Sequence, residues 1–243
     1  MGRAIHIFAR ENTLRRSALA SLLPIGAALA GAAVPLGAPG VFMALAVYLG
    51  IGASVLRGLD AHRPSRRFGA ANSVTAARAA VASLLFGAWI EGAPGSGLRL
   101  ALTALAAVAF LADGLDGYLA RRGTATRFGA RFDMETDALL VLALSLLVHA
   151  WGQAGAFVLL SGAMRYLYGA ARWVVPALRA PLAPSVRRQA ICVAQTGVLI
   201  VAMAPPVPAS FASPLCAAGL VLLIASFAID CAAASSARAR TLY

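Results

Sequence analysis

The stretch DGLDGYLARRGTATRFGARFDMETD, residues 113–137, holds five of the nine acidic residues of the chain. It joins the end of one very apolar segment to the start of the next. A carboxylate at a membrane boundary is costly unless it is paired with, or bound to, a cation. Carboxylates that recur here with regular spacing therefore indicate a metal site.

The composition around this stretch is that of a membrane protein. Of the 243 residues, 60% are hydrophobic and 12% are charged, and the mean hydropathy is +0.80. A segment must cross about 30 Å of hydrocarbon to span a bilayer. Segments of that length lie at residues 17–35, 41–57, 73–90, 99–117, 133–151, 154–175, 189–205 and 211–230. The sequence predicts an all-α fold, a polytopic helix bundle with eight transmembrane helices.

The chain shows no Gly/Ser-rich linker or low-complexity tract that would separate a soluble domain. The first two predicted helices form a short hairpin, and the residues that indicate function all follow it. We expect residues 1–71 to hold a cytoplasmic N-terminus and this accessory hairpin, and residues 72–243 to form the membrane domain.

The net charge of +12 comes from arginine, since the chain has no lysine. Arginines precede the first predicted helix and follow the second, fourth, sixth and eighth, whereas the alternate connections carry almost no basic charge. The positive-inside rule then places both termini and the acidic stretch in the cytoplasm, in a multi-pass protein of the bacterial inner-membrane type. Nucleic acid is not an expected partner, because the arginines are divided among short connections and form no basic domain.

The spacing of the aspartates predicts how their side chains meet. Asp113 and Asp116 are three residues apart, and Asp133 and Asp137 are four apart, so each pair lies on one face of its helix. Two such faces across a short hairpin bring four carboxylates together, and oxygen ligands suit Mg²⁺ or Mn²⁺. Solvated carboxylates that offset nearby arginines are the alternative, but this explains one or two acids better than two like-charged pairs.

Residues between the two pairs fit a phosphate-bearing ligand beside the metal. Gly117 and Gly129 leave room for a bulky ligand, or for the two helices, to approach the ion. Arg121 lies one turn beyond Gly117 and can meet phosphate oxygens bidentately.

At these residues the chain resembles the CDP-alcohol phosphotransferase family, also called the CDP-alcohol phosphatidyltransferases. The spacer after the Ala-Arg element is one residue shorter than is usual in the family. The segment NSVTAAR, residues 72–78, also looks like the start of the first core helix of the family. The places of the family motif are filled by Asp113, Asp116, Gly117, Ala120, Arg121, Gly129, Asp133 and Asp137.

The resemblance implies a six-helix core over about residues 72–230, a homodimer, and transfer of a phosphatidyl group from a CDP-linked lipid to an alcohol with release of CMP. One or two Mg²⁺ or Mn²⁺ ions would be held by four aspartates, of which Asp137 would also be the catalytic base. By the same analogy the nucleotide would contact Thr75, Asp116, Gly117, Ala120, Arg121 and Gly129. The partners implied are the CDP-linked lipid, a polar alcohol and membrane lipids.

Arginines later in the chain suggest the class of alcohol. An arginine inside a membrane is expensive, so Arg165 is expected to face a polar cavity. We hypothesise that Arg165, with Arg187 or Arg188, holds a phosphate on the acceptor. This favours glycerol 3-phosphate or an inositol phosphate over serine or choline. An equally open alternative is that Arg172 and the Arg187/Arg188 pair mark the cytoplasmic boundary.

Two other functions stay open at this point. An intramembrane prenyltransferase also binds Mg²⁺-diphosphate through aspartates, but such proteins resemble a layout with two Asp-rich motifs far apart in sequence. A divalent-cation transporter would need carboxylates near the bilayer midplane, whereas these lie at one membrane face. Release of CMP from a CDP-lipid separates all three.

Overall fold

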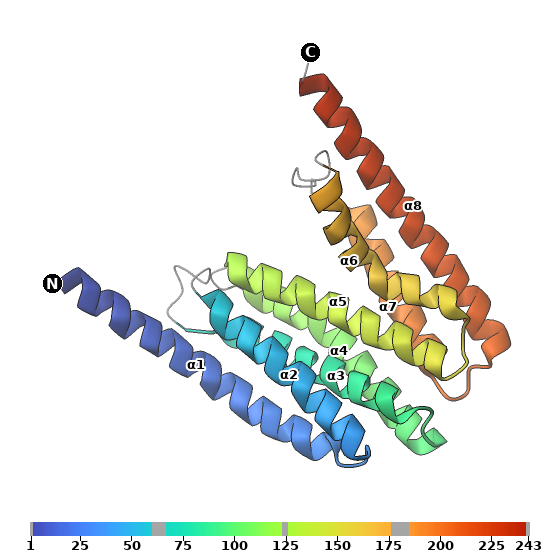
Figure 1. Ribbon diagram of the computed structural model, residues 1–243, viewed down its shortest axis with the longest axis horizontal. Coiled ribbons are helices and arrows are strands. Elements are labelled where there is room, and N and C mark those ends of the chain that lie inside the picture. Colours follow the sequence, from blue (N-terminus) through green and yellow to red (C-terminus); the bar gives the residue numbers. More distant parts are fainter. Residues whose placement is uncertain (1, 60–66, 123–125, 176–184, 242–243) are drawn as a thin grey trace. The chain divides into compact units, whose positions relative to one another are not determined.

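The computed structural model describes residues 2–59, 67–122, 126–175 and 185–241, and side-chain environments over 12–59, 67–114, 126–175 and 185–232. Over this part of the chain the structure is helical, which confirms the predicted all-α class (Figure 1). The elements are α1 (Gly2–Ala33), α2 (Ala38–Gly58), α3 (Ala70–Glu91), α4 (Ser96–Arg122), α5 (Arg127–Ala150), the short 3-10 helix η2 (Ala156–Val158), α6 (Leu159–Val174), α7 (Val186–Met203) and α8 (Ala209–Thr241).

Among the described residues, five helices are long and apolar enough to cross a membrane. They lie at Ala38–Gly58, Ala70–Glu91, Ser96–Gly114, Val186–Met203 and Ala209–Ala232. Two of the three other predicted spans depart from this pattern for different reasons. Helix α6 has 16 residues, which corresponds to about 24 Å of helix, and α5 carries three acidic residues in its first half. The chain is thus a multi-pass membrane protein with five such helices in its described part.

The chain forms two compact units, Met1–Ala143 and Leu144–Tyr243. In the first unit, α3 is the central helix, because it contacts α1, α2 and α4. Most of its side chains between Asn72 and Ala88 are buried, and a helix that is covered on every side belongs in a core. Its ends are set by Gly69 and Gly92, whose φ angles of 83° and 84° suit a residue without a Cβ atom.

The N-terminal hairpin of α1 and α2 is tied to the start of α3 by polar contacts. The Ser17 hydroxyl accepts a hydrogen bond from the Phe68 amide at 3.0 Å. The Ser73 hydroxyl donates to the Ser21 oxygen at 3.0 Å. These bonds cross between α1 and the start of α3, and in a membrane each satisfies a polar group that lipid cannot.

At the other end of α3, the backbone of α2 packs closely against α3 at glycine residues, and a carboxylate of α3 caps the first turn of α2. The Glu91 Oε1 atom accepts a hydrogen bond from the Gly40 amide at 2.6 Å, in the first turn of α2. That amide has no partner inside its own helix, so the acid at the end of α3 serves as its cap. A Cβ atom at Gly87 would lie 2.5 Å from the carbonyl oxygen of Gly40. The two backbones therefore meet directly.

The second unit is organised around the pair α7 and α8, which contact each other, while η2 and α6 also contact α8. Gln195 of α7 is buried, and its Nε2 atom donates to the Ser161 hydroxyl of α6 at 2.9 Å. Ser185 precedes α7, and its side chain accepts from the Arg188 amide at 3.4 Å. Ser185 therefore occupies the N-cap position of the helix whose first turn bears Arg187 and Arg188.

Substituting Gly87 with Ala is expected to lower the free energy of unfolding of the detergent-solubilised protein by about 1–3 kcal/mol, because the added methyl group pushes α2 away from α3. Gly50→Ala on α2 is the matched control, since a Cβ atom there meets nothing within 4 Å. The measurement is chemical unfolding followed by tryptophan fluorescence. If Gly87→Ala were as stable as Gly50→Ala, the close backbone contact would not constrain the hairpin.

Candidate functional site

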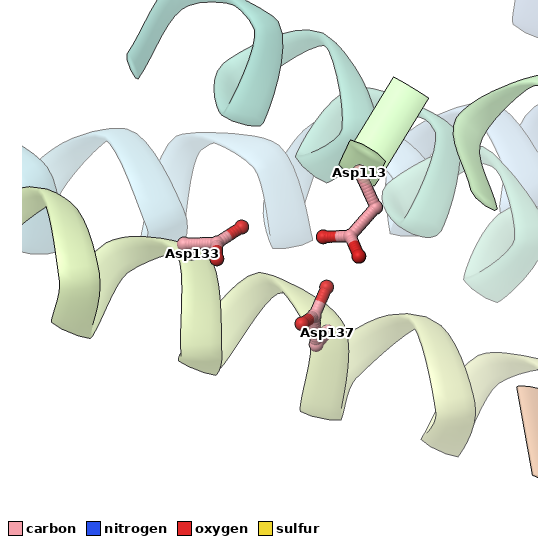
Figure 2. A group of neighbouring side chains, drawn as sticks. All are labelled: Asp113, Asp133 and Asp137. Atoms are coloured by element: carbon pink, nitrogen blue, oxygen red, sulfur yellow. The ribbon is translucent and has the colours of Figure 1, made fainter. Parts of the chain in front are cut away.

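Three of the four predicted metal ligands converge in the first unit. Asp113 comes from α4, and Asp133 and Asp137 come from successive turns of α5. Each offers one carboxylate oxygen, and these oxygens all lie within 4.8 Å of one another. Figure 2 shows the three carboxylates turned toward a common point. Their side chains are 35%, 40% and 46% exposed, respectively, so the cluster is open to an ion from one side.

The remaining motif residues on α4 cannot be placed in this cluster. Asp116, the fourth predicted ligand, lies outside the residues whose side chains the structure describes. The same holds for Gly117, Ala120 and Arg121. Their predicted contacts with metal and nucleotide remain predictions.

A basic residue that the sequence analysis did not assign to the site contacts all three carboxylates. Arg78 of α3 is 2% exposed, and its Nη1 atom donates to Asp133 Oδ1 at 2.7 Å. Its Nη2 atom lies 2.8 Å from Asp113 Oδ1 and also donates to Asp137 Oδ1. One guanidinium thus joins α3, α4 and α5. An isolated arginine in the apolar, alanine-rich segment 73–90 was the available signal, because a charge there requires a partner.

The charges of this cluster do not cancel. Asp113, Asp133 and Asp137 carry three negative charges when ionised, and Arg78 supplies one positive charge. These four side chains together carry −2 when ionised, and this charge in a partly buried location attracts a cation. Carboxylate oxygens are the ligands that Mg²⁺ and Mn²⁺ prefer, and separations of this size need only small side-chain movements to reach ligand distances of about 2.1 Å. The triad therefore fits a divalent ion.

The start of α5 is held close to α3, which places its two aspartates opposite Arg78. The Thr126 hydroxyl accepts from the Gly129 amide at 3.0 Å and caps α5. A Cβ atom at Gly129 would lie 3.0 Å from Asn72 Oδ1 and 3.3 Å from Thr126 Oγ1. Gly129, predicted at the nucleotide site, is thus also the point where α5 approaches the buried Asn72 of α3.

An aromatic cluster supports the same junction. The rings of Phe68, Phe128 and Phe132 lie with centroids 5.9–6.3 Å apart, and all three residues are buried. Phe132 immediately precedes Asp133, so this packing fixes the first turns of α5 against the chain that enters α3.

Thr75, also predicted to contact the nucleotide, is buried in α3 with 2% exposure. Its hydroxyl donates to the Ala71 carbonyl at 3.1 Å, one turn earlier in the same helix. The structure thus gives Thr75 a local partner within its helix, and its contact with a nucleotide remains a prediction.

Two of the predicted acceptor-binding arginines meet in the second unit. Arg187 Nη2 donates to Asp230 Oδ1 at 2.7 Å, and Arg188 Nη1 donates to Asp230 Oδ2 at 3.0 Å. Arg187 Nη1 also donates to the Ser226 hydroxyl at 2.7 Å. Asp230 is buried and was missed in the sequence analysis, although a lone acid in the last apolar segment signals a partner. The third arginine, Arg165, lies half-buried on α6.

Comparison with known proteins identifies the family. Residues 68–232 match the family model described as CDP-alcohol phosphatidyltransferase. This match covers more than half of the chain, so the chain belongs to that family, and the resemblance seen in the motif is confirmed. Comparisons with curated proteins and with solved structures return no match. The chain is therefore a membrane enzyme with CDP-alcohol phosphatidyltransferase activity in phospholipid synthesis.

Proposed function

We propose that this member of the family transfers a phosphatidyl group from a CDP-linked lipid such as CDP-diacylglycerol to the hydroxyl of a phosphorylated alcohol, glycerol 3-phosphate or an inositol phosphate. The observation that carries the catalytic part is the convergence of Asp113, Asp133 and Asp137 within 4.8 Å. It occurs inside the region that matches the family, residues 68–232. The family match favours this function over the prenyltransferase and transporter alternatives.

The aspartates are proposed to hold one or two Mg²⁺ or Mn²⁺ ions, with Asp116 as the fourth ligand. When bound, such an ion neutralises the charge that builds on the pyrophosphate as the nucleotide leaves. The nucleotide is proposed to lie beside Asp116, Gly117, Ala120, Arg121, Gly129 and Thr75. Arg121 would contribute a bidentate contact with a phosphate.

Asp137 is proposed as the general base. Its carboxylate takes the proton of the acceptor hydroxyl, and the alcohol oxygen forms a bond to the lipid-bearing phosphorus of the donor. The bond from that phosphorus to the bridging oxygen breaks, and CMP leaves with the bonding electrons. A base positioned on the hydroxyl typically accelerates such a step by about 10²–10⁴-fold. Asp137 is 46% exposed, which leaves the carboxylate open to an acceptor.

The choice of a phosphorylated acceptor rests on the second unit. Arg187 and Arg188 converge on a single carboxylate, Asp230, so this cluster keeps one positive charge in excess. Arg187 and Arg188 are 35% and 24% exposed, so solvent reaches part of each side chain. We propose that these arginines, with Arg165, bind the acceptor phosphate through charge-assisted hydrogen bonds.

The eight-span topology is also proposed, with both termini and the acidic cluster in the cytoplasm. Helices α1, α5 and α6 would supply the crossings beyond the five identified by length and composition. The arginine distribution supports this orientation. A homodimer is proposed from the family resemblance, and the mass of the detergent-purified particle measures it.

Reconstituted protein with CDP-diacylglycerol and Mg²⁺ or Mn²⁺ should release CMP in the presence of glycerol 3-phosphate or an inositol phosphate. Asp137→Asn should lower turnover by about 100-fold or more, because the base is lost, while binding of labelled CDP-diacylglycerol is largely retained. Glu135→Gln, two residues away on α5, is the control and should keep its activity. Turnover of Asp137→Asn at the wild-type rate would rule out Asp137 as the base.

Arg165→Ala and Arg188→Ala are each expected to raise the KM for the phosphorylated acceptor by about ten-fold, the effect of one lost charge-assisted hydrogen bond. The KM for the CDP-linked donor should stay constant, and inorganic phosphate should inhibit the wild type more strongly than either variant. Arg172→Ala, on the same helix as Arg165, is the control. Unchanged acceptor KM values in both variants would remove the phosphate-binding role.

Reporter fusions are expected to place the C-terminus after Tyr243 in the cytoplasm and the connection at residues 91–98 on the opposite side. A fluorescent protein that matures only in the cytoplasm and a phosphatase that is active only outside it give complementary signals. Phosphatase activity at the C-terminus would contradict the proposed orientation.

A further inference from the structure

We propose that Arg78 is a resident counter-ion of the Asp113, Asp133 and Asp137 triad. It holds the three carboxylates together when no dication is bound, and it lowers the affinity of the site for the dication. Arg78 is therefore a positioning residue that acts through the metal ligands. The inference rests on the proposed metal-dependent function and assigns a role to a residue of α3.

The first argument is geometric. Arg78 bonds to all three carboxylates, at 2.7 Å from Asp133 and 2.8 Å from Asp113, with Asp137 as the third partner. The planar guanidinium presents several donors in a fixed fork, so a single side chain can join three acceptors. A lysine ammonium is a compact point charge and lacks this fork.

The second argument concerns access. The Arg78 side chain is 2% exposed, whereas its three partners are 35–46% exposed. The arginine thus contacts the carboxylates from the protein interior, and the exposed side of the triad is left for an ion. Arg78 and a dication can then share the carboxylates from opposite sides.

The third argument is the balance of charge. When ionised, the three described carboxylates carry −3, Arg78 brings the charge of these four side chains to −2, and a dication offsets that remaining charge. Without Arg78, the ion-free protein would have to hold three ionised carboxylates within 4.8 Å, which is unfavourable in a partly buried location. With Arg78, the triad stays assembled, but the arginine repels the incoming ion.

The test measures Mn²⁺ binding and stability in the full-length protein purified in detergent. Free Mn²⁺ is followed by electron paramagnetic resonance, and thermal unfolding is recorded with and without saturating Mn²⁺. Arg78→Gln is expected to lower the Kd for Mn²⁺ by about ten-fold or more, because a nearby positive charge is removed. The same variant should unfold at a lower temperature than the wild type without metal, and Mn²⁺ should recover most of this loss.

Two further variants separate charge from shape. Arg78→Lys keeps the charge and loses the fork, so its Kd for Mn²⁺ should stay near the wild-type value while its metal-free stability falls. Arg131→Gln removes an exposed arginine from α5 and should leave both the Kd and the unfolding temperature unchanged.

The outcomes are distinguishable. An Arg78→Gln variant with an unchanged or higher Kd, or with the same stability loss in the presence and absence of Mn²⁺, would overturn the inference. If this variant folds only when prepared with Mn²⁺, the counter-ion role is supported, and if it folds in neither condition, the role is excluded. A wild type that neither binds Mn²⁺ nor releases CMP would instead refute the proposed function.

Discussion

The first unit depends on one constraint: three ionised carboxylates within 4.8 Å of one another in a partly buried place repel one another, and a cation among them stabilises the arrangement. Arg78 meets this constraint from within the protein and, in doing so, connects α3 to both α4 and α5. The close approach at Gly129 and the phenylalanine cluster serve the same junction. Site geometry and helix packing are therefore parts of one arrangement.

The N-terminal hairpin of α1 and α2 lies outside the family match at residues 68–232, yet it packs on the helix that carries Arg78. Bonds from Ser17 and Ser21 reach the start of α3, and Glu91 at its end caps α2. In lipid, where apolar burial gives little drive for helix association, such polar bonds and glycine contacts determine how helices pair. The hairpin thus contacts α3 near both ends and stabilises its position.

The sequence predicted the all-α class and the convergence of aspartates from two neighbouring helices, because these follow from helical periodicity and a short connection. It did not predict Arg78 as their partner, since that pairing joins residues 35–59 positions apart and depends on tertiary packing. Asp230 was missed for the same reason, with partners 42 and 43 positions away. Eight spans were predicted, whereas five described helices are long and apolar enough to cross a membrane. The apolar pattern did not show that α6 has 16 residues, and it gave little weight to the three acidic residues in the first half of α5.

The described part of the chain holds two arginine–carboxylate clusters that are each partly neutralised, and the charge left over differs in sign between them. In the first unit, one arginine faces three acids and leaves an excess of negative charge. In the second unit, two arginines face Asp230 and leave an excess of positive charge. Partial neutralisation lets charged groups stay partly buried without a ligand, since a charge left without a partner is more costly than an imperfect pair. The sign of this excess charge favours a cation at the first cluster, and it is the basis for proposing that the second cluster binds the acceptor phosphate.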